Sequence, residues 1–184
     1  MKQALSTLKR GAGEMEAKEE LEQMMTSFLN KANEEEIELL KTVFKGIEEK
    51  RSGKYVSYVA AFTQMEAKFL PNGDYEITIP IQPLIYNHLK MVHGGITATL
   101  ADTAMGTMIS EKLPPDLSVV TAEIKMNYIK PGLGKYLRCV ATLLNQGKHL
   151  CVTEAKIYSD KNELVASALG TFFIIKKQQK DSTK

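Results

Sequence analysis

The spacing of hydrophobic residues predicts helices at the start of the chain. Over residues 14–29 and 33–50, apolar side chains recur every three or four positions, which is the period of an amphipathic helix. Asn33, followed by three glutamates, has the composition of an N-cap with an acidic first turn. Residues 1–52 are therefore predicted to form an N-terminal helical extension.

From Tyr55 onward the period becomes that of β-strands. Residues 62–70 and 75–81 flank the turn sequence Pro71-Asn72-Gly73-Asp74, and together they predict a β-hairpin. Four further runs separated by turn sequences predict four more strands, at residues 120–128, 136–144, 149–158 and 164–175. In the first of these runs, the alternation places Val120, Ala122, Ile124, Met126 and Tyr128 on one face.

A central helix is predicted between the hairpin and the later strands, over residues 92–110. It is apolar or small on every side except at Asp102, and a helix without a polar face is normally surrounded by its own domain. Since strands joined by short turns pair antiparallel, this element order predicts an α+β fold in which an antiparallel sheet wraps around one helix. An irregular passage, residues 82–91, leads into that helix.

Asp102 is the one carboxylate in this predicted core. Removing an ionised carboxylate from water is costly, so a buried Asp is paired, neutralised by a proton, or kept for chemistry. Its neighbours one helical turn away, Ala98 and Gly106, are small and predict an open slot beside it. Two interpretations remain: close packing with Asp102 bonded to a backbone amide, or a catalytic carboxylate.

The sequence His93-Gly94-Gly95 lies where this helix should begin. The first amides of a helix have no partner within the helix, and glycines allow another group to approach them closely. This arrangement is typical of an oxyanion or anion site, although a flexible entry into the helix has the same composition.

The composition is that of an ordinary globular chain of one domain plus an appendage. Its 184 residues are 43% hydrophobic and carry a net charge of +2, which suggests neither a nucleic acid nor an anionic membrane as partner. Up to Lys50, eight lysines and arginines stand against eleven glutamates, a poor composition for a DNA-binding arm. With no signal pattern and no apolar run near the roughly 20 residues that span a bilayer, we expect a cytoplasmic protein.

The cysteines and histidines point to no metal site and no cysteine chemistry. Cys139 and Cys151 are predicted on neighbouring strands, where thiols in a reducing cytosol serve as small hydrophobic residues. Neither pairs with a histidine at a suggestive spacing, and no metal-ligand spacing occurs. His88 and His149 are interpreted as exposed loop residues.

Taken together, Asn87, His93-Gly94-Gly95 and Ala101-Asp102-Thr103 resemble the motif of the PaaI-like (phenylacetate-type) acyl-CoA thioesterases. The similarity covers roughly residues 55–175. It implies a hotdog fold for residues 53–176, with 177–184 as a disordered tail, and hydrolysis of an acyl-CoA thioester.

The resemblance also implies a role for each site residue. Asp102 acts on the thioester as nucleophile or general base, and the amide of Gly94 donates to the oxyanion. Asn87 and His93 lie beside the thioester carbonyl, with His93 helping to polarise it. Thr121, on the strand after the helix, holds the attacking water.

The partners follow from the same resemblance. Coenzyme A is part of the substrate, so no separate cofactor is expected, and Lys130 and Lys148, at turns, are candidate contacts for its phosphates. Members of the family form dimers that pair into tetramers. Gly94 and Asp102 are eight residues apart, about 12 Å along one helix, so one helix cannot serve one thioester with both groups. A two-fold dimer can, with Gly94 of one subunit beside Asp102 of the other.

Two other functions remain open on this fold. One is a non-catalytic regulator that binds acyl-CoA and is joined to a DNA-binding segment. The acidic N-terminal extension argues against this function. The other is a hydratase or dehydratase. In the best-known branch of those enzymes, an Asp is followed five residues later by a His. Here the residue five positions after Asp102 is Thr107.

Overall fold

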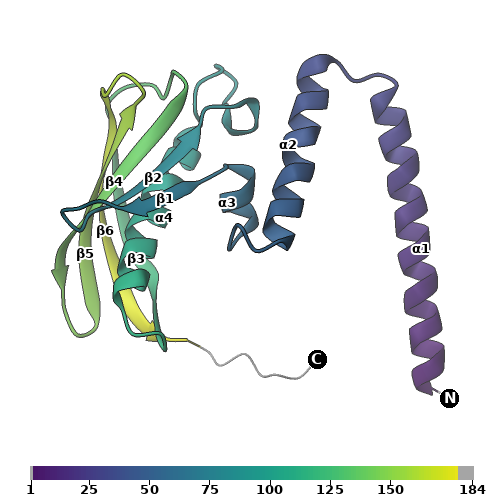
Figure 1. The fold of residues 1–184 in the computed structure, drawn as a ribbon, viewed down its shortest axis with the longest axis horizontal. Coiled ribbons are helices and arrows are strands. Elements are labelled where there is room, and N and C mark those ends of the chain that lie inside the picture. The colour runs from purple at the N-terminus through teal and green to yellow at the C-terminus, as the bar shows by residue number, and fades with distance from the viewer. Residues whose placement is uncertain (1, 178–184) are drawn as a thin grey trace. The chain divides into compact units, whose positions relative to one another are not determined.

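The computed structural model describes residues 2–177, which divide into two compact units, one up to Lys45 and one from Gly46 onward. Both predicted N-terminal helices are confirmed as α1 (Lys2–Leu29) and α2 (Glu34–Arg51) (Figure 1). The predicted N-cap forms as a reciprocal pair, since Asn33 Oδ1 accepts from the Glu36 amide and Glu36 Oε2 accepts from the Asn33 amide, each at 2.9 Å. α1 starts well before residue 14, although two glycines lower its helix propensity there.

The second unit is built on one antiparallel sheet, as predicted. Its strands are β1 (Glu66–Phe69), β2 (Tyr75–Pro80), β3 (Leu117–Tyr128), β4 (Tyr136–Gln146), β5 (Leu150–Ser159) and β6 (Leu164–Lys176). They lie in the order β1-β2-β4-β5-β6-β3, so β1 and β3 form the two edges. The β1–β2 turn contains Gly73 at a φ of 87°, a backbone conformation that glycine adopts without strain.

One stretch before the hairpin differs from the strand prediction. Residues Tyr58–Phe62 form the short helix α3, whose N-cap Ser57 accepts a hydrogen bond from the Ala60 amide. Ala60 and Ala61 are buried, so the apolar pattern from Tyr55 reports the inner side of a short helix rather than a strand. The local cap outweighs a strand signal that is only a few residues long.

The central helix is α4 (Gly94–Lys112), which lies along one face of the sheet (Figure 1). Its inner face is fully buried, through residues that include Leu100, Ala104 and Met108. The expectation that the helix is enclosed on every side is wrong for the single chain. Because one sheet covers only one face of α4, Asp102 and Gly106 on the other side stay half-buried.

The passage before α4 is irregular, as predicted, apart from a 3₁₀ turn at Pro83–Ile85. Two backbone hydrogen bonds hold the last residues before α4 in place. The His93 amide donates to the carbonyl of Ile85, and the Val92 amide donates to that of Gly132. Of the predicted tail only Lys177 is described, and residues 178–184 lie outside the described part of the chain.

Candidate active site

Asp102 and Thr121 are brought together between α4 and β3. The Thr121 hydroxyl donates to Asp102 Oδ1 at 2.7 Å. Both side chains line a cavity of about 420 Å³ between α4 and the part of the sheet formed by β3 and β6. Its other lining residues are small, hydroxylated or apolar, and they are Thr103, Gly106, Thr107, Ser110, Val119, Val120 and Phe172. Asp102 is thus paired with a side-chain hydroxyl and not with the backbone amide of the simpler packing interpretation.

A β-bulge in β3 decides that Thr121 faces the helix. Thr121 pairs with Phe172 and Glu123 pairs with Thr171, so Ala122 is the extra residue. The predicted alternation along 120–128 is therefore wrong in its first half, because the bulge reverses which residues face α4. Bulges of this kind often re-aim a side chain at a functional site.

The predicted slot beside the carboxylate is present on one side only. Gly106 lines the cavity, whereas Ala98 does not. A Cβ at Gly106 would lie 3.2 Å from Cε1 of Phe172, so β6 approaches α4 closely at this level. Because Gly106 has no side chain, β6 can pack closely against α4 and the cavity beside Asp102 stays open.

His93 caps the start of α4 with its ring. The Gly95 amide donates to His93 Nδ1 at 2.9 Å, which assigns the imidazole proton to Nε2 in the neutral ring. A Cβ at position 95 would lie only 3.0 Å from that Nδ1. Among residues 2–177, the Gly94 amide donates no hydrogen bond. The structure therefore leaves one amide of the first turn available to a ligand, beside an exposed imidazole N–H.

A second cavity, of about 260 Å³, lies beside Gly94. Met91, Val92, Gly94 and Thr97 line it from one side, and residues 128–132 with Val165 from the other. Tyr128, which the sequence did not single out, donates its hydroxyl to the Gly94 carbonyl at 2.9 Å. The alternating pattern of β3 contains Tyr128 but carries no signal for this contact.

Asn87 organises the loop before α4. Its Oδ1 accepts hydrogen bonds from the amides of Leu89 at 2.9 Å and Met91 at 3.2 Å. It lines neither of the two cavities. In the single chain, then, Asn87 supports the segment that enters the site.

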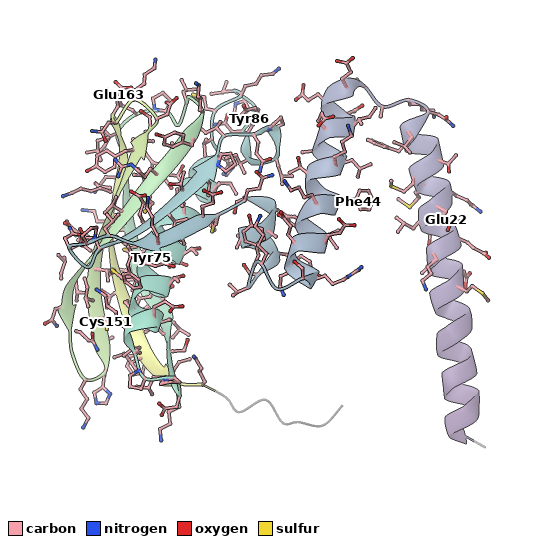
Figure 2. The ribbon with its side chains drawn as sticks, viewed as in Figure 1. Glu22, Phe44, Tyr75, Tyr86, Cys151 and Glu163 are labelled. Atoms are coloured by element: carbon pink, nitrogen blue, oxygen red, sulfur yellow. The ribbon has the colours of Figure 1, made fainter. Side chains whose placement is uncertain are left out.

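The two lysines proposed for coenzyme A differ in position. Lys130 lines the cavity at Gly94, and its Nζ lies 2.7 Å from Oε1 of Glu163. Glu163 lies in the β5–β6 turn (Figure 2). The hydrogen bond and the charge of Lys130 hold the pKa of Glu163 below its usual value. Lys148 lies in the β4–β5 turn and lines neither cavity.

The structure also describes both cysteines of the chain. Cys139 and Cys151 are free and buried on neighbouring strands β4 and β5, and burial raises the pKa of Cys139 to about 12. Between residues 2 and 177, no group of three or more His, Cys, Asp or Glu side chains is placed to hold a metal ion. None of the helices in that range is long and apolar enough to cross a membrane.

The two cavities divide the predicted site into halves. None of the described residues lines both, and their anchors, Gly94 and Asp102, are eight residues apart on α4, about 12 Å along its axis. A reacting carbonyl needs donor and carboxylate within roughly 3–3.5 Å of its reacting atoms. Within one chain, each half is formed without the other.

Comparison with known proteins places these residues in a family context. The model of the thioesterase superfamily matches residues 89–166, a range that contains His93, Gly94, Asp102 and Thr121 but not Asn87. The chain is similar to the BH2602 protein of Bacillus halodurans, whose crystal structure was determined with CoA. The identity is 46% and the TM-score 0.78, and the match covers 83% of this chain and 99% of that one.

Two more distant relatives complete the comparison. The medium/long-chain acyl-CoA thioesterase YigI of Escherichia coli is 25% identical over 98 residues, 46% of this chain and 63% of the relative. The chain thus spans less than two thirds of the length of the first curated relatives it matches. The E. coli PaaI protein, at 21% identity and a TM-score of 0.60 over 73% of this chain and 96% of that one, shares the fold.

Proposed function

The chain belongs to the thioesterase superfamily, with the hotdog fold, and we propose that it hydrolyses acyl-CoA thioesters with Asp102 and the Gly94 amide. The observation that carries the proposal is the hydrogen bond from Thr121 to Asp102 inside an open cavity. A free amide at the start of the same helix adds the second group that acyl transfer needs.

Asp102 supplies the base or the nucleophile. Thr121 donates to one carboxylate oxygen, so the other oxygen and the lone pairs of the Thr121 hydroxyl are left to hold a water molecule. As general base, Asp102 takes a proton from that water while the water oxygen attacks the thioester carbonyl. As nucleophile, it forms an acyl anhydride that water then hydrolyses. Both routes break the C–S bond and yield a carboxylic acid and the thiol of coenzyme A.

The oxyanion is stabilised at the start of α4. The amide of Gly94 points out of the first helical turn, where the helix dipole favours negative charge. The Nε2–H of His93 is a second donor near the same carbonyl, which is the polarising role expected of this residue. A thioester carbonyl is less resonance-stabilised than that of an ester, so one or two such donors suffice.

We infer that the complete site forms between two subunits. β3 is an edge strand that, among residues 2–177, pairs with β6 alone, and its exposed residues include Val120 and Tyr128. An unpaired edge beside the half-buried side of α4 is suited to meeting a second copy across a two-fold axis. Antiparallel packing of two α4 helices then places Gly94 of one subunit beside Asp102 of the other. A homodimer, or a tetramer made of two such dimers, is the expected assembly.

Lys130 is the cation placed to meet the coenzyme A phosphates. Of the described residues that line the cavity at Gly94, it is the only basic one. Lys148 is kept as a second candidate on its turn position alone. Coenzyme A enters as part of the substrate, and we expect a cytoplasmic protein with no nucleic-acid or membrane partner.

The test is a panel of acyl-CoA esters of different acyl groups, assayed for thiol release. The Asp102→Asn protein, purified in the same way, is assayed in parallel, because it detects any contaminating thioesterase. Thiol release by the wild type and not by the variant supports the proposal. Binding of acyl-CoA without hydrolysis of any ester in the panel would favour the non-catalytic regulator instead.

A further inference from the structure

We propose that Tyr128 is a positioning residue that holds the first turn of α4 so that the Gly94 amide points at the developing oxyanion. This inference rests on the proposed function and adds to it a residue outside the predicted site. Its starting point is the 2.9 Å hydrogen bond from the Tyr128 hydroxyl to the Gly94 carbonyl.

The start of α4 needs such an anchor because two consecutive glycines form it. Glycine has more backbone freedom than any other residue, so Gly94 and Gly95 on their own would let the first turn move. The peptide between them is held from both sides. Its carbonyl accepts from Tyr128, and its N–H donates to His93 Nδ1 at 2.9 Å.

The preceding peptide, which carries the Gly94 N–H, is held through its own carbonyl. The His93 carbonyl accepts from the amides of Ile96 at 2.9 Å and Thr97 at 3.1 Å. With the peptides on both sides of the Gly94 Cα restrained, the direction of the free N–H is set. A donor that is already oriented does not have to be reorganised during the reaction, which is the main source of oxyanion stabilisation.

The fold brings Tyr128 and Thr121 to the same helix from one strand. They are seven residues apart on β3, an odd spacing that would place them on opposite faces of a regular strand. The bulge at Ala122 corrects the parity, so Thr121 reaches Asp102 and Tyr128 reaches Gly94. β3 thereby aligns both functional groups of α4.

The hydroxyl of Tyr128 and its ring have separable roles. The ring lines the cavity, and its atoms would lie 3.5 Å from a Cβ at Gly94, an ordinary van der Waals distance. Tyr128→Phe keeps this wall and removes only the hydrogen bond. Tyr136→Phe is the matched control, because Tyr136 lies on β4 outside both cavities and its hydroxyl makes no hydrogen bond to the described residues.

The first measurement is the kinetics of both variants with the best acyl-CoA ester of the wild type. We expect Tyr128→Phe to lower kcat about tenfold, because the Gly94 amide is loosened and not removed, with KM changed by less than about twofold. Tyr136→Phe should match the wild type in both constants. An unchanged kcat in Tyr128→Phe, whether or not KM rises, would overturn the proposal.

The second measurement does not depend on activity. With the chain labelled at its twelve glycines with ¹⁵N, backbone order parameters are compared among the wild type and the two variants. Tyr128→Phe should lower the values at Gly94 and Gly95 from about 0.85 toward 0.6, and Tyr136→Phe should not. Unchanged order parameters at both glycines would contradict the positioning role of Tyr128, whether or not an acyl-CoA ester is hydrolysed. Absence of hydrolysis with lowered order parameters would contradict only the proposed function.

Discussion

The start and the middle of α4 offer two different kinds of chemical group. At the start, the available group is the Gly94 N–H. The peptide that follows it is held by a hydrogen bond from Tyr128 to the Gly94 carbonyl and by one from the Gly95 N–H to the ring of His93. In the middle it is the carboxylate of Asp102, held by the hydroxyl of Thr121. Each opens into its own cavity, and the two cavities have no lining residue in common within the described part of the chain.

This difference shows how one helix can serve a reaction that it cannot complete alone. In the proposed mechanism the amide stabilises negative charge and the carboxylate accepts a proton or attacks, and a thioester needs both groups at one carbon. If two helices meet antiparallel, each contributes the half that the other lacks. Changes confined to one half should therefore have distinct and predictable effects.

Removing the charge in the middle of α4 should have the largest effect. Asp102→Asn keeps the shape and the acceptor for Thr121 but cannot act as base or nucleophile, so kcat should fall by roughly 100-fold or more. Asp116→Asn, at an exposed loop position, is the matched control and should keep full turnover. Near-wild-type turnover in the Asp102 variant would make this carboxylate structural.

Mixing damaged halves should restore activity if the site is shared. The second protein carries Asn87→Asp and His93→Asp, which keep acceptors for the loop amides and for the helix cap but remove the side-chain donors. After refolding with the Asp102→Asn protein, half of the dimers are mixed and each has one intact site. Activity should then reach about a quarter of wild type.

Mass spectrometry of the refolded mixture supplies the control for this experiment. Mixed dimers without recovered activity would show that each subunit builds its own site. Recovery in the mixture, when each variant refolded alone stays inactive, requires groups from two subunits.

Removing the hydroxyl that holds the carboxylate should have an intermediate effect. Thr121→Val keeps the approximate shape but leaves Asp102 Oδ1 without its donor and the water without one contact, so kcat should fall about tenfold. Thr142→Val, on β4 outside both cavities, should change neither kcat nor the melting temperature by much. Equal losses in the two variants would point to a general effect of the substitution.

The smallest effect is expected at the rim of the Gly94 cavity. Glu163→Gln frees Lys130 from its ion pair, so KM for acyl-CoA esters should fall about threefold, the scale of an exposed salt bridge. Because Lys130 lowers the pKa of Glu163, the pair breaks as the pH falls through that lowered value, and wild type and variant should converge there.

The comparison substrate is an acyl-pantetheine thioester, which lacks the nucleotide. Its KM should be the same in the wild type and in Glu163→Gln. A shift for both substrates would mean that Glu163 acts on the cavity and not through the phosphates of coenzyme A.

Much of this molecule is determined by the sequence alone. The period of the apolar residues, the capping residue Asn33, and the turn at Asn72-Gly73 act over a few positions, so they predict the order of helices and strands. The motif around Asp102 likewise identifies the helix that carries the candidate chemistry. These signals are readable because the physics behind them is local.

The tertiary structure decides how these groups meet. A bulge at Ala122 turns Thr121 toward Asp102 while Tyr128 still faces Gly94. The residues around Ala122 do not predict this bulge. The exposure of Asp102 depends on which side of α4 the sheet covers, which cannot be read from a helix that is apolar nearly all round. Pairing between strands and burial are set by contacts between residues far apart in the chain, and these contacts, not local preference, assemble the two halves of the site.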